Sequence, residues 1–180
     1  MTSLRQREFV QVDVFTSVPY LGNALAVVKD ATGLTPEQMQ QFARWTNLSE
    51  TTFLLPPTNP AADYLVKIYT PDCELPFAGH PTLGSAHAWL EAGGNPKDPE
   101  GKVIVQECGV GLVKIRREAG GKLALAAPKL MRTGPVDEER VQRACHVMGI
   151  SREDVVDHEW LDNGPGWFGL LLKDAQKVLD

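Results

Sequence analysis

Residues 74–84 of the 180-residue chain read ELPFAGHPTLG. They place a glycine, a histidine and a proline at the start of a helix that we predict over residues 82–90. Proline suits the first helical turn, because its missing N–H would have no partner there. Gly79 allows the backbone to approach a ligand closely. Because the N–H groups of a first turn are unpaired and the helix dipole favours negative charge at this end, the segment predicts a carboxylate-binding pocket with His80 at its edge.

A second segment, NLSETTFLL at residues 47–55, places Glu50 where a helical pattern gives way to a strand pattern. The residues after Glu50 are mostly apolar, and no basic residue lies within five positions on its C-terminal side. A carboxylate that is partly removed from water in such surroundings is a candidate for moving protons. Taken alone, a glutamate at this position is more often an ordinary surface residue, and a single histidine is more often structural than catalytic.

Together, these two segments resemble the PhzF family, the phenazine-biosynthesis-type isomerases that share the diaminopimelate-epimerase fold. Three further segments are typical of the family and occur in its order and spacing, so the resemblance covers the whole first lobe. They are VDVFT at residues 12–16, GNALAV at 22–27 and LTPEQM at 34–39.

The resemblance implies an α+β fold, in which a diaminopimelate-epimerase-like lobe wraps a mixed or antiparallel barrel-like sheet around a central helix. It implies that Glu50 is the general acid/base, which moves a proton between carbons of a small carboxylated metabolite. Gly79 and His80 match substrate-binding residues of the family, and Ser49 and Asn23 line the same cavity. No cofactor and no metal is implied.

The chain departs from the family pattern after residue 128. Family members have two similar lobes with the site in the cleft between them, and the second lobe normally supplies an Asp-Pro-x-Thr-Gly-Ser type segment. No such segment occurs between Pro128 and Asp180. We therefore expect residues 1–128 to form the first lobe and residues 129–180 to form the inter-lobe connection and the start of a second lobe. A non-catalytic small-molecule-binding module and an inactive truncated family member remain alternatives to an enzyme.

The composition limits the classes of partner. A net charge of −5 argues against nucleic acids and anionic membranes. No stretch approaches the roughly 20 apolar residues of a membrane span, and the first eight residues carry no apolar signal-peptide core. We expect a cytoplasmic protein, and a homodimer is a reasonable expectation for such an enzyme.

The three cysteines show no metal-ligand spacing, which fits a reducing compartment. Epimerases of this fold use a thiol in the loop that corresponds to residues 78–81, where this chain has Ala78. Cys108 lies instead between two strand-like runs, so we predict a structural role for it and disfavour a two-cysteine racemase mechanism.

Local patterns predict the remaining elements. Thr35 is a good N-cap for a helix that begins at Pro36, and Asp13 is expected to fix a turn next to the site. Further helices are predicted over residues 137–148 and 174–179, and strands over residues 8–15, 24–29, 51–55, 62–69, 102–107, 110–117, 122–127 and 167–172.

Overall fold

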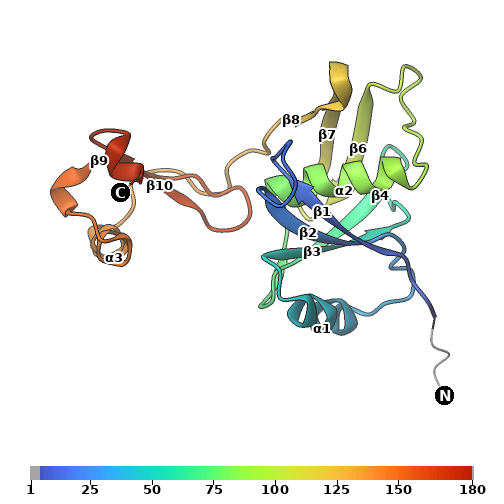
Figure 1. Ribbon diagram of the computed structural model, residues 1–180, viewed down its shortest axis with the longest axis horizontal. Coiled ribbons are helices and arrows are strands. Elements are labelled where there is room, and N and C mark those ends of the chain that lie inside the picture. The colour runs from blue at the N-terminus through green and yellow to red at the C-terminus, as the bar shows by residue number, and fades with distance from the viewer. Residues whose placement is uncertain (1–4, 180) are drawn as a thin grey trace. The chain divides into compact units, whose positions relative to one another are not determined.

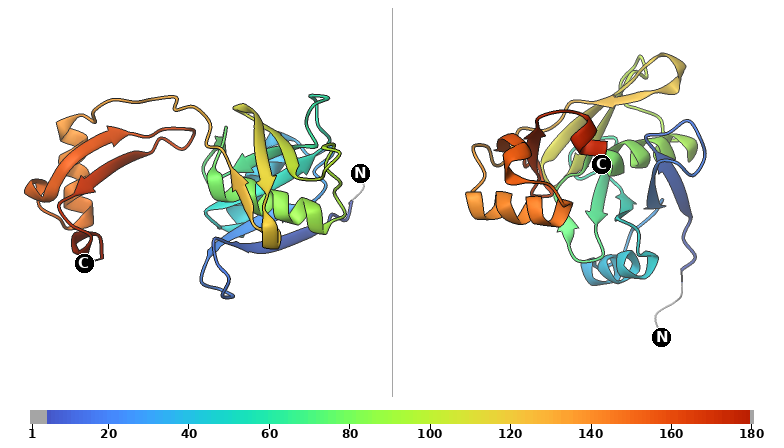
Figure 2. Two further views of the ribbon diagram at one scale, coloured as in Figure 1. Left: turned by 90° about the horizontal axis from the view of Figure 1, so that it is seen from above. Right: turned by 60° about the vertical axis from the view of Figure 1, so that its left-hand side comes forward.

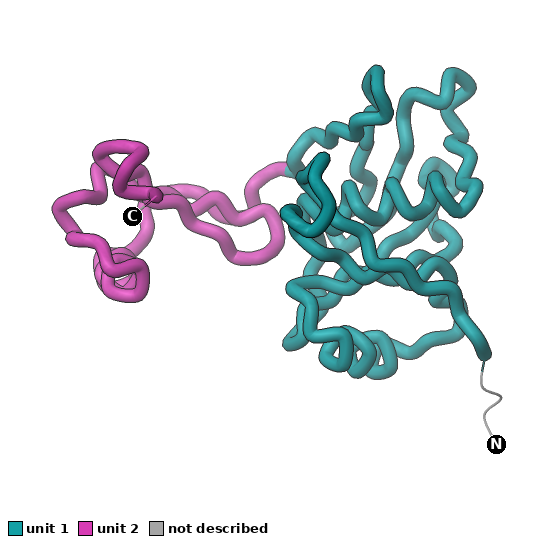
Figure 3. The backbone as a smooth tube through the Cα atoms, in the orientation of Figure 1, with its two compact units in different colours: residues 1–128 teal, residues 129–180 magenta. Residues whose placement is uncertain are grey.

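The computed structural model describes residues 5–179, which fall into two compact units. Unit 1 comprises residues 1–128 and unit 2 residues 129–180 (Figure 3). Among the described residues, no helix combines the length and the apolar character that crossing a membrane requires.

Unit 1 is built on an eight-stranded mixed sheet with the order β1-β2-β3-β4-β6-β7-β8, and β5 pairs with β4 (Figure 1). Neighbouring strands run antiparallel except for the pairs β2–β3 and β4–β6, which are parallel. The sheet forms a half-barrel around helix α2 (Gly79–Glu91), as Figure 2 shows. The strands are β1 (Phe9–Val14), β2 (Asn23–Val28), β3 (Glu50–Leu55), β4 (Tyr64–Tyr69), β5 (Glu74–Leu75), β6 (Val103–Cys108), β7 (Gly111–Arg117) and β8 (Leu123–Leu125), with a 3-10 turn η1 at Ala119–Gly121.

Both faces of the central strands are buried. Since side chains alternate across a strand, neighbouring residues of β2, β3 and β4 enter different cores. One core packs against α2, and the other packs against α1 (Pro36–Thr46) on the opposite face. The first contains Val27, Leu54 and Ile68, and the second contains Val28, Phe53 and Tyr69.

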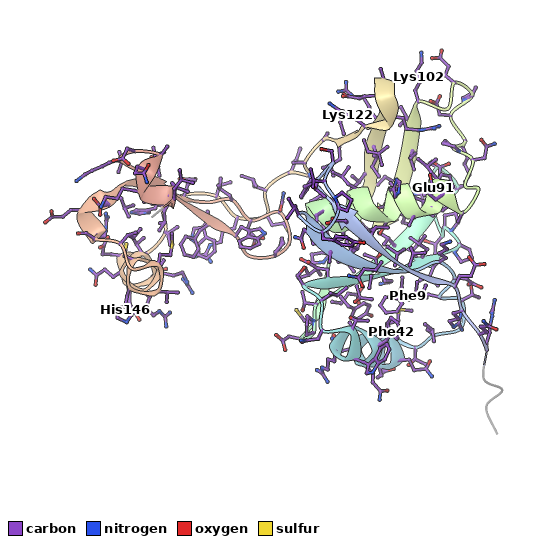
Figure 4. All side chains as sticks on the ribbon, in the orientation of Figure 1. Phe9, Phe42, Glu91, Lys102, Lys122 and His146 are labelled. Atoms are coloured by element: carbon purple, nitrogen blue, oxygen red, sulfur yellow. The ribbon has the colours of Figure 1, made fainter. Side chains whose placement is uncertain are left out.

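Helix α1 begins as predicted. The Thr35 hydroxyl accepts from the Gln38 N–H, and the Gln38 side chain accepts from the Thr35 N–H, which forms a capping box. The ring of Phe42 meets that of Phe9 edge-on at a centroid distance of 5.8 Å and that of Phe53 at 6.0 Å. Figure 4 labels Phe42 on α1 and Phe9 on β1. These contacts fix α1 against the sheet.

Helix α2 begins at Gly79, three residues before the predicted start. The Thr82 N–H donates to the Ala78 carbonyl at 3.2 Å, and this first intrahelical bond requires residues 79–81 to be helical. Pro81 fits the third position because its missing N–H has no intrahelical acceptor there. Gly79, His80 and Pro81 therefore form the first turn of the helix instead of preceding it.

Buried polar side chains tie α2 to the sheet. Gln106 on β6 donates through Nε2 to the Thr82 hydroxyl at 3.0 Å and accepts from the Tyr64 hydroxyl at 3.0 Å. One turn further along the helix, the Ser85 hydroxyl donates to the Thr52 hydroxyl at 2.9 Å. Because these groups are buried, each needs its partner, and the helix is held at one depth and rotation.

Unit 2 packs one helix against a two-stranded antiparallel sheet. Its core contains Val136, Val141, Cys145, Val155 and Trp160. Its elements are α3 (Glu138–Met148), η2 (Arg152–Asp154), β9 (Val155–Trp160), β10 (Phe168–Leu172) and α4 (Gln176–Leu179).

The predicted strands are all present, with ends that differ by no more than two residues. Two strands were not predicted. Strand β5 has only two residues, too few for a periodic pattern, and β9 reads VVDHEW, in which three consecutive polar residues interrupt the alternation.

Gly84 is expected to be intolerant of a side chain. A Cβ atom there would lie 2.6 Å from Leu25 Cδ2 and 2.9 Å from Val14 Cγ2, whereas a Cβ at Gly79 would meet nothing within 4 Å. Gly84→Ala should lower the free energy of unfolding by about 1–3 kcal/mol, as overpacking does. Gly79→Ala in the same helix is the control. Equal urea midpoints for the two variants would contradict this packing.

Thr82→Val keeps the shape of the side chain but removes the acceptor of Gln106. The buried Gln106 Nε2 would lose its partner, so urea unfolding should show a loss of about 1–3 kcal/mol. The double variant Thr82→Val/Gln106→Leu should lose less than the sum of the two single losses, because the unpaired Gln106 donor no longer exists. The Tyr64 hydroxyl loses its acceptor in Gln106→Leu and in the double variant alike. A double variant whose loss equals the sum of the two single losses would refute the coupling.

Candidate active site

The first residues of two parallel strands lie side by side in unit 1. Asn23 begins β2 and Glu50 begins β3, and the register pairs Leu25 with Glu50. Gly79 and His80 form the start of α2, and the Asn23 amide contacts His80. The fold thus brings together all five predicted site residues, because Ser49 directly precedes Glu50.

Glu50 and His80 face each other. Glu50 Oε2 lies 3.4 Å from His80 Nε2, and the side chains are only 16% and 8% exposed. Within the described residues, neither of these two atoms has a hydrogen-bond partner, although both are buried. A buried polar atom without a partner is costly, so the pair is suited to receive a polar group from a ligand.

His80 is held in place from its other ring nitrogen. Asn23 Nδ2 lies 3.3 Å from His80 Nδ1, and the Ser49 hydroxyl donates to Asn23 Oδ1 at 3.3 Å. Asn23 and Ser49 are both exposed, so this chain of contacts leads from the surface to the buried pair.

Burial holds the pKa of His80 below its usual value, because water no longer stabilises the charged ring. The Glu50 carboxylate opposes this shift by attracting the charged ring, but burial dominates. Burial therefore favours the neutral form of the imidazole.

The first turn of α2 presents backbone donors that the helix itself does not use. The N–H groups of Gly79 and His80 have no intrahelical acceptor, and the N-cap residue Ala78 has no side chain that could cap them. The space beside Gly79 is open. This helix end, with its dipole, can accept a carboxylate close to the Glu50–His80 pair.

The β1–β2 loop borders the site with an exposed aromatic residue. Phe15 has a φ of +68° and a 71% exposed side chain, and its ring lies 6.4 Å from that of His80. Asp13 fixes the loop, as predicted, because its carboxylate accepts from the Tyr20 N–H at 2.7 Å. No role was predicted for Phe15, because a positive φ at a phenylalanine has no local sequence signal.

Cys108 lies outside this group. It is buried at the end of β6, and burial raises the pKa of its thiol, which disfavours a reactive thiolate. Among the described residues, no group of three or more histidine, cysteine, aspartate or glutamate side chains is arranged to hold a metal ion.

Comparison with known proteins places the chain in a family. The model of the PhzC-PhzF family, described as phenazine biosynthesis-like protein, matches residues 12–180. Antisense-enhancing sequence 1 of Schizosaccharomyces pombe is 38% identical over 183 residues, which cover 98% of this chain and 61% of that protein. The trans-2,3-dihydro-3-hydroxyanthranilate isomerase of Pseudomonas fluorescens is 56% identical over 80 residues, 44% of this chain and 28% of the isomerase.

Among solved structures, a predicted epimerase from Pseudomonas aeruginosa superposes with a TM-score of 0.74 at 27% identity, covering 96% of this chain and 61% of that one. The chain thus spans about three fifths of the length of the relatives that it matches throughout. These similarities confirm the predicted α+β fold of the diaminopimelate-epimerase type. The chain belongs to the PhzC-PhzF family of phenazine biosynthesis-like proteins.

Proposed function

We infer that this chain carries the acid/base half of an isomerase site, in which Glu50 moves a proton between two carbons of a small carboxylated metabolite. The observation that carries this proposal is the buried, unpartnered pair of Glu50 Oε2 and His80 Nε2 in front of an uncapped helix end. The names of the relatives support it, because they include isomerases and an epimerase.

The proposed reaction needs one group that alternates between two protonation states. The Glu50 carboxylate accepts a proton from a carbon next to an activating group, and the C–H electron pair remains in the substrate as a delocalised carbanion. The resulting carboxylic acid returns the proton to a different carbon, which shifts a double bond or inverts a centre. Substrate and product have the same atoms, and the enzyme ends in its starting state.

We assign substrate binding to the residues around Glu50. The N–H groups of Gly79 and His80 are suited to a substrate carboxylate, and the exposed polar side chains of Asn23 and Ser49 line the same region.

The test uses the complete protein, deuterium oxide and trans-2,3-dihydro-3-hydroxyanthranilate, the substrate named for a relative, as the probe. The native protein should convert the probe and incorporate deuterium. Glu50→Gln should slow both at least about 100-fold, because it removes the proton-transfer group, while the dissociation constant of the probe stays within about threefold. Glu91→Gln, on the exposed end of the same helix α2, removes the same charge and should behave like the native protein.

Two outcomes would overturn the proposal. Full turnover by Glu50→Gln would exclude Glu50 as the acid/base. Saturable binding by the native protein with no deuterium incorporation would instead assign the chain to a non-catalytic binding module.

The state of His80 leads to a pH prediction. Its pKa is lower in the folded protein than in the unfolded chain, so the unfolded chain takes up a proton first as the pH falls. The free energy of unfolding should therefore decrease as the pH falls below about 6.5 towards the folded-state pKa. Urea titrations between pH 7.5 and 5.5 should show a weaker pH dependence for His80→Gln.

His87→Gln is the control for this titration, because His87 is exposed on the same helix. It should keep the pH dependence of the native protein. An unchanged pH dependence in His80→Gln would contradict the burial of a neutral imidazole.

A further inference from the structure

Ser49, Asn23 and His80 form a series of contacts that ends at Glu50. In this series each side chain directs a nitrogen or a hydroxyl towards the next residue. The Ser49 hydroxyl donates to Asn23 Oδ1, and the Asn23 amide nitrogen lies 3.3 Å from His80 Nδ1. His80 Nε2 in turn lies 3.4 Å from Glu50 Oε2. An amide nitrogen only donates, so His80 Nδ1 must be the acceptor, and the single proton of the neutral ring lies on Nε2.

We propose that Asn23 is a positioning residue that holds the proton of His80 on Nε2, where it faces the Glu50 carboxylate. This proposal deepens, and rests on, the proposed role of Glu50 as the acid/base. Asn23 and Gly79 thus have different roles: Asn23 orients the His80 ring, and the Gly79 backbone N–H binds the substrate carboxylate.

The opposite arrangement is disfavoured by the same contacts. If Asn23 turned its Oδ1 towards the ring, His80 would carry its proton on Nδ1, and the Nε2 lone pair would face Glu50 Oε2 at 3.4 Å. Two acceptors would then oppose each other in a place where neither atom has another partner within the described residues. The hydroxyl of Ser49 can both donate and accept, so it fits either orientation of the Asn23 amide. The tautomer of His80 therefore depends on Asn23 and Glu50.

The Nε2 proton has a defined use in the reaction. Facing Glu50, it stabilises the carboxylate form that takes the first proton from the substrate. Because the ring is neutral, it does so without the full charge of an imidazolium, which would make the carboxylate a weaker base. A polar substrate oxygen that took the place of Glu50 Oε2 as the acceptor would receive the same proton as a hydrogen bond.

The experiment is a nitrogen-detected NMR assignment of the His80 ring in ¹⁵N-labelled protein at pH 7.5, with His80→Gln identifying the signals. In the native protein, the protonated nitrogen should be Nε2. Asn23→Asp places an acceptor-only carboxylate opposite Nδ1, so the ring should move its proton to Nδ1 or become doubly protonated. Asn23→Ala should lose the single tautomer and show a mixture.

Asn95→Asp is the charge-matched control, because Asn95 is exposed in the loop after α2, and it should leave the native tautomer unchanged. An Nδ1 proton in the native protein would overturn the proposal, as would an unchanged Nε2 tautomer in both Asn23 variants. Folding of each variant is checked by circular dichroism, and an Nδ1 proton in the native protein would overturn the proposal even where a variant does not fold.

The readout is independent of turnover. Full activity of Glu50→Gln would remove the acid/base assignment while leaving the tautomer result intact. An Nδ1 proton in the native protein would remove the role of Asn23 while leaving Glu50 as the acid/base.

Discussion

The seating of α2 in the half-barrel is the constraint on which the rest of unit 1 depends. Gly84 lets the helix approach Leu25 and Val14 more closely than any side chain would allow. Gln106 and Thr52 on the sheet then hold Thr82 and Ser85 at fixed positions. Because apolar packing and buried hydrogen bonds act together, the helix has one depth and one rotation.

This seating determines the chemistry available at the helix start. The first turn stands in front of the beginnings of β2 and β3, so backbone donors, an imidazole and a carboxylate converge from three elements that are distant in sequence. Burial of Glu50 Oε2 and His80 Nε2 without other partners opposes folding, and the surrounding core offsets it. Such local cost is typical of a site that is arranged for a ligand.

Much of the fold could be predicted from local patterns. The Thr35 cap, the Pro36 start and the apolar runs of β2, β3 and β4 all carry local signals, and these elements are where they were expected. Strand β9 was missed because its polar centre hides the alternation. The start of α2 was placed too late because Gly79, His80 and Pro81 were expected to precede the helix and not to form its first turn. The positive φ of Phe15 depends on the anchored β1–β2 loop, which has no pattern in single residues.

For the site, the sequence by itself determined the types of group: the ELPFAGHPTLG and NLSETTFLL segments and their family resemblance pointed to Glu50, Gly79, His80, Ser49 and Asn23. The tertiary structure alone decided that these side chains meet, at which distances, and with which partners. Strand register places the start of β2, which carries Asn23, beside Glu50, and the position of α2 brings His80 to both residues. These are long-range contacts, and the burial that neutralises His80 arises only when the chain has closed around them.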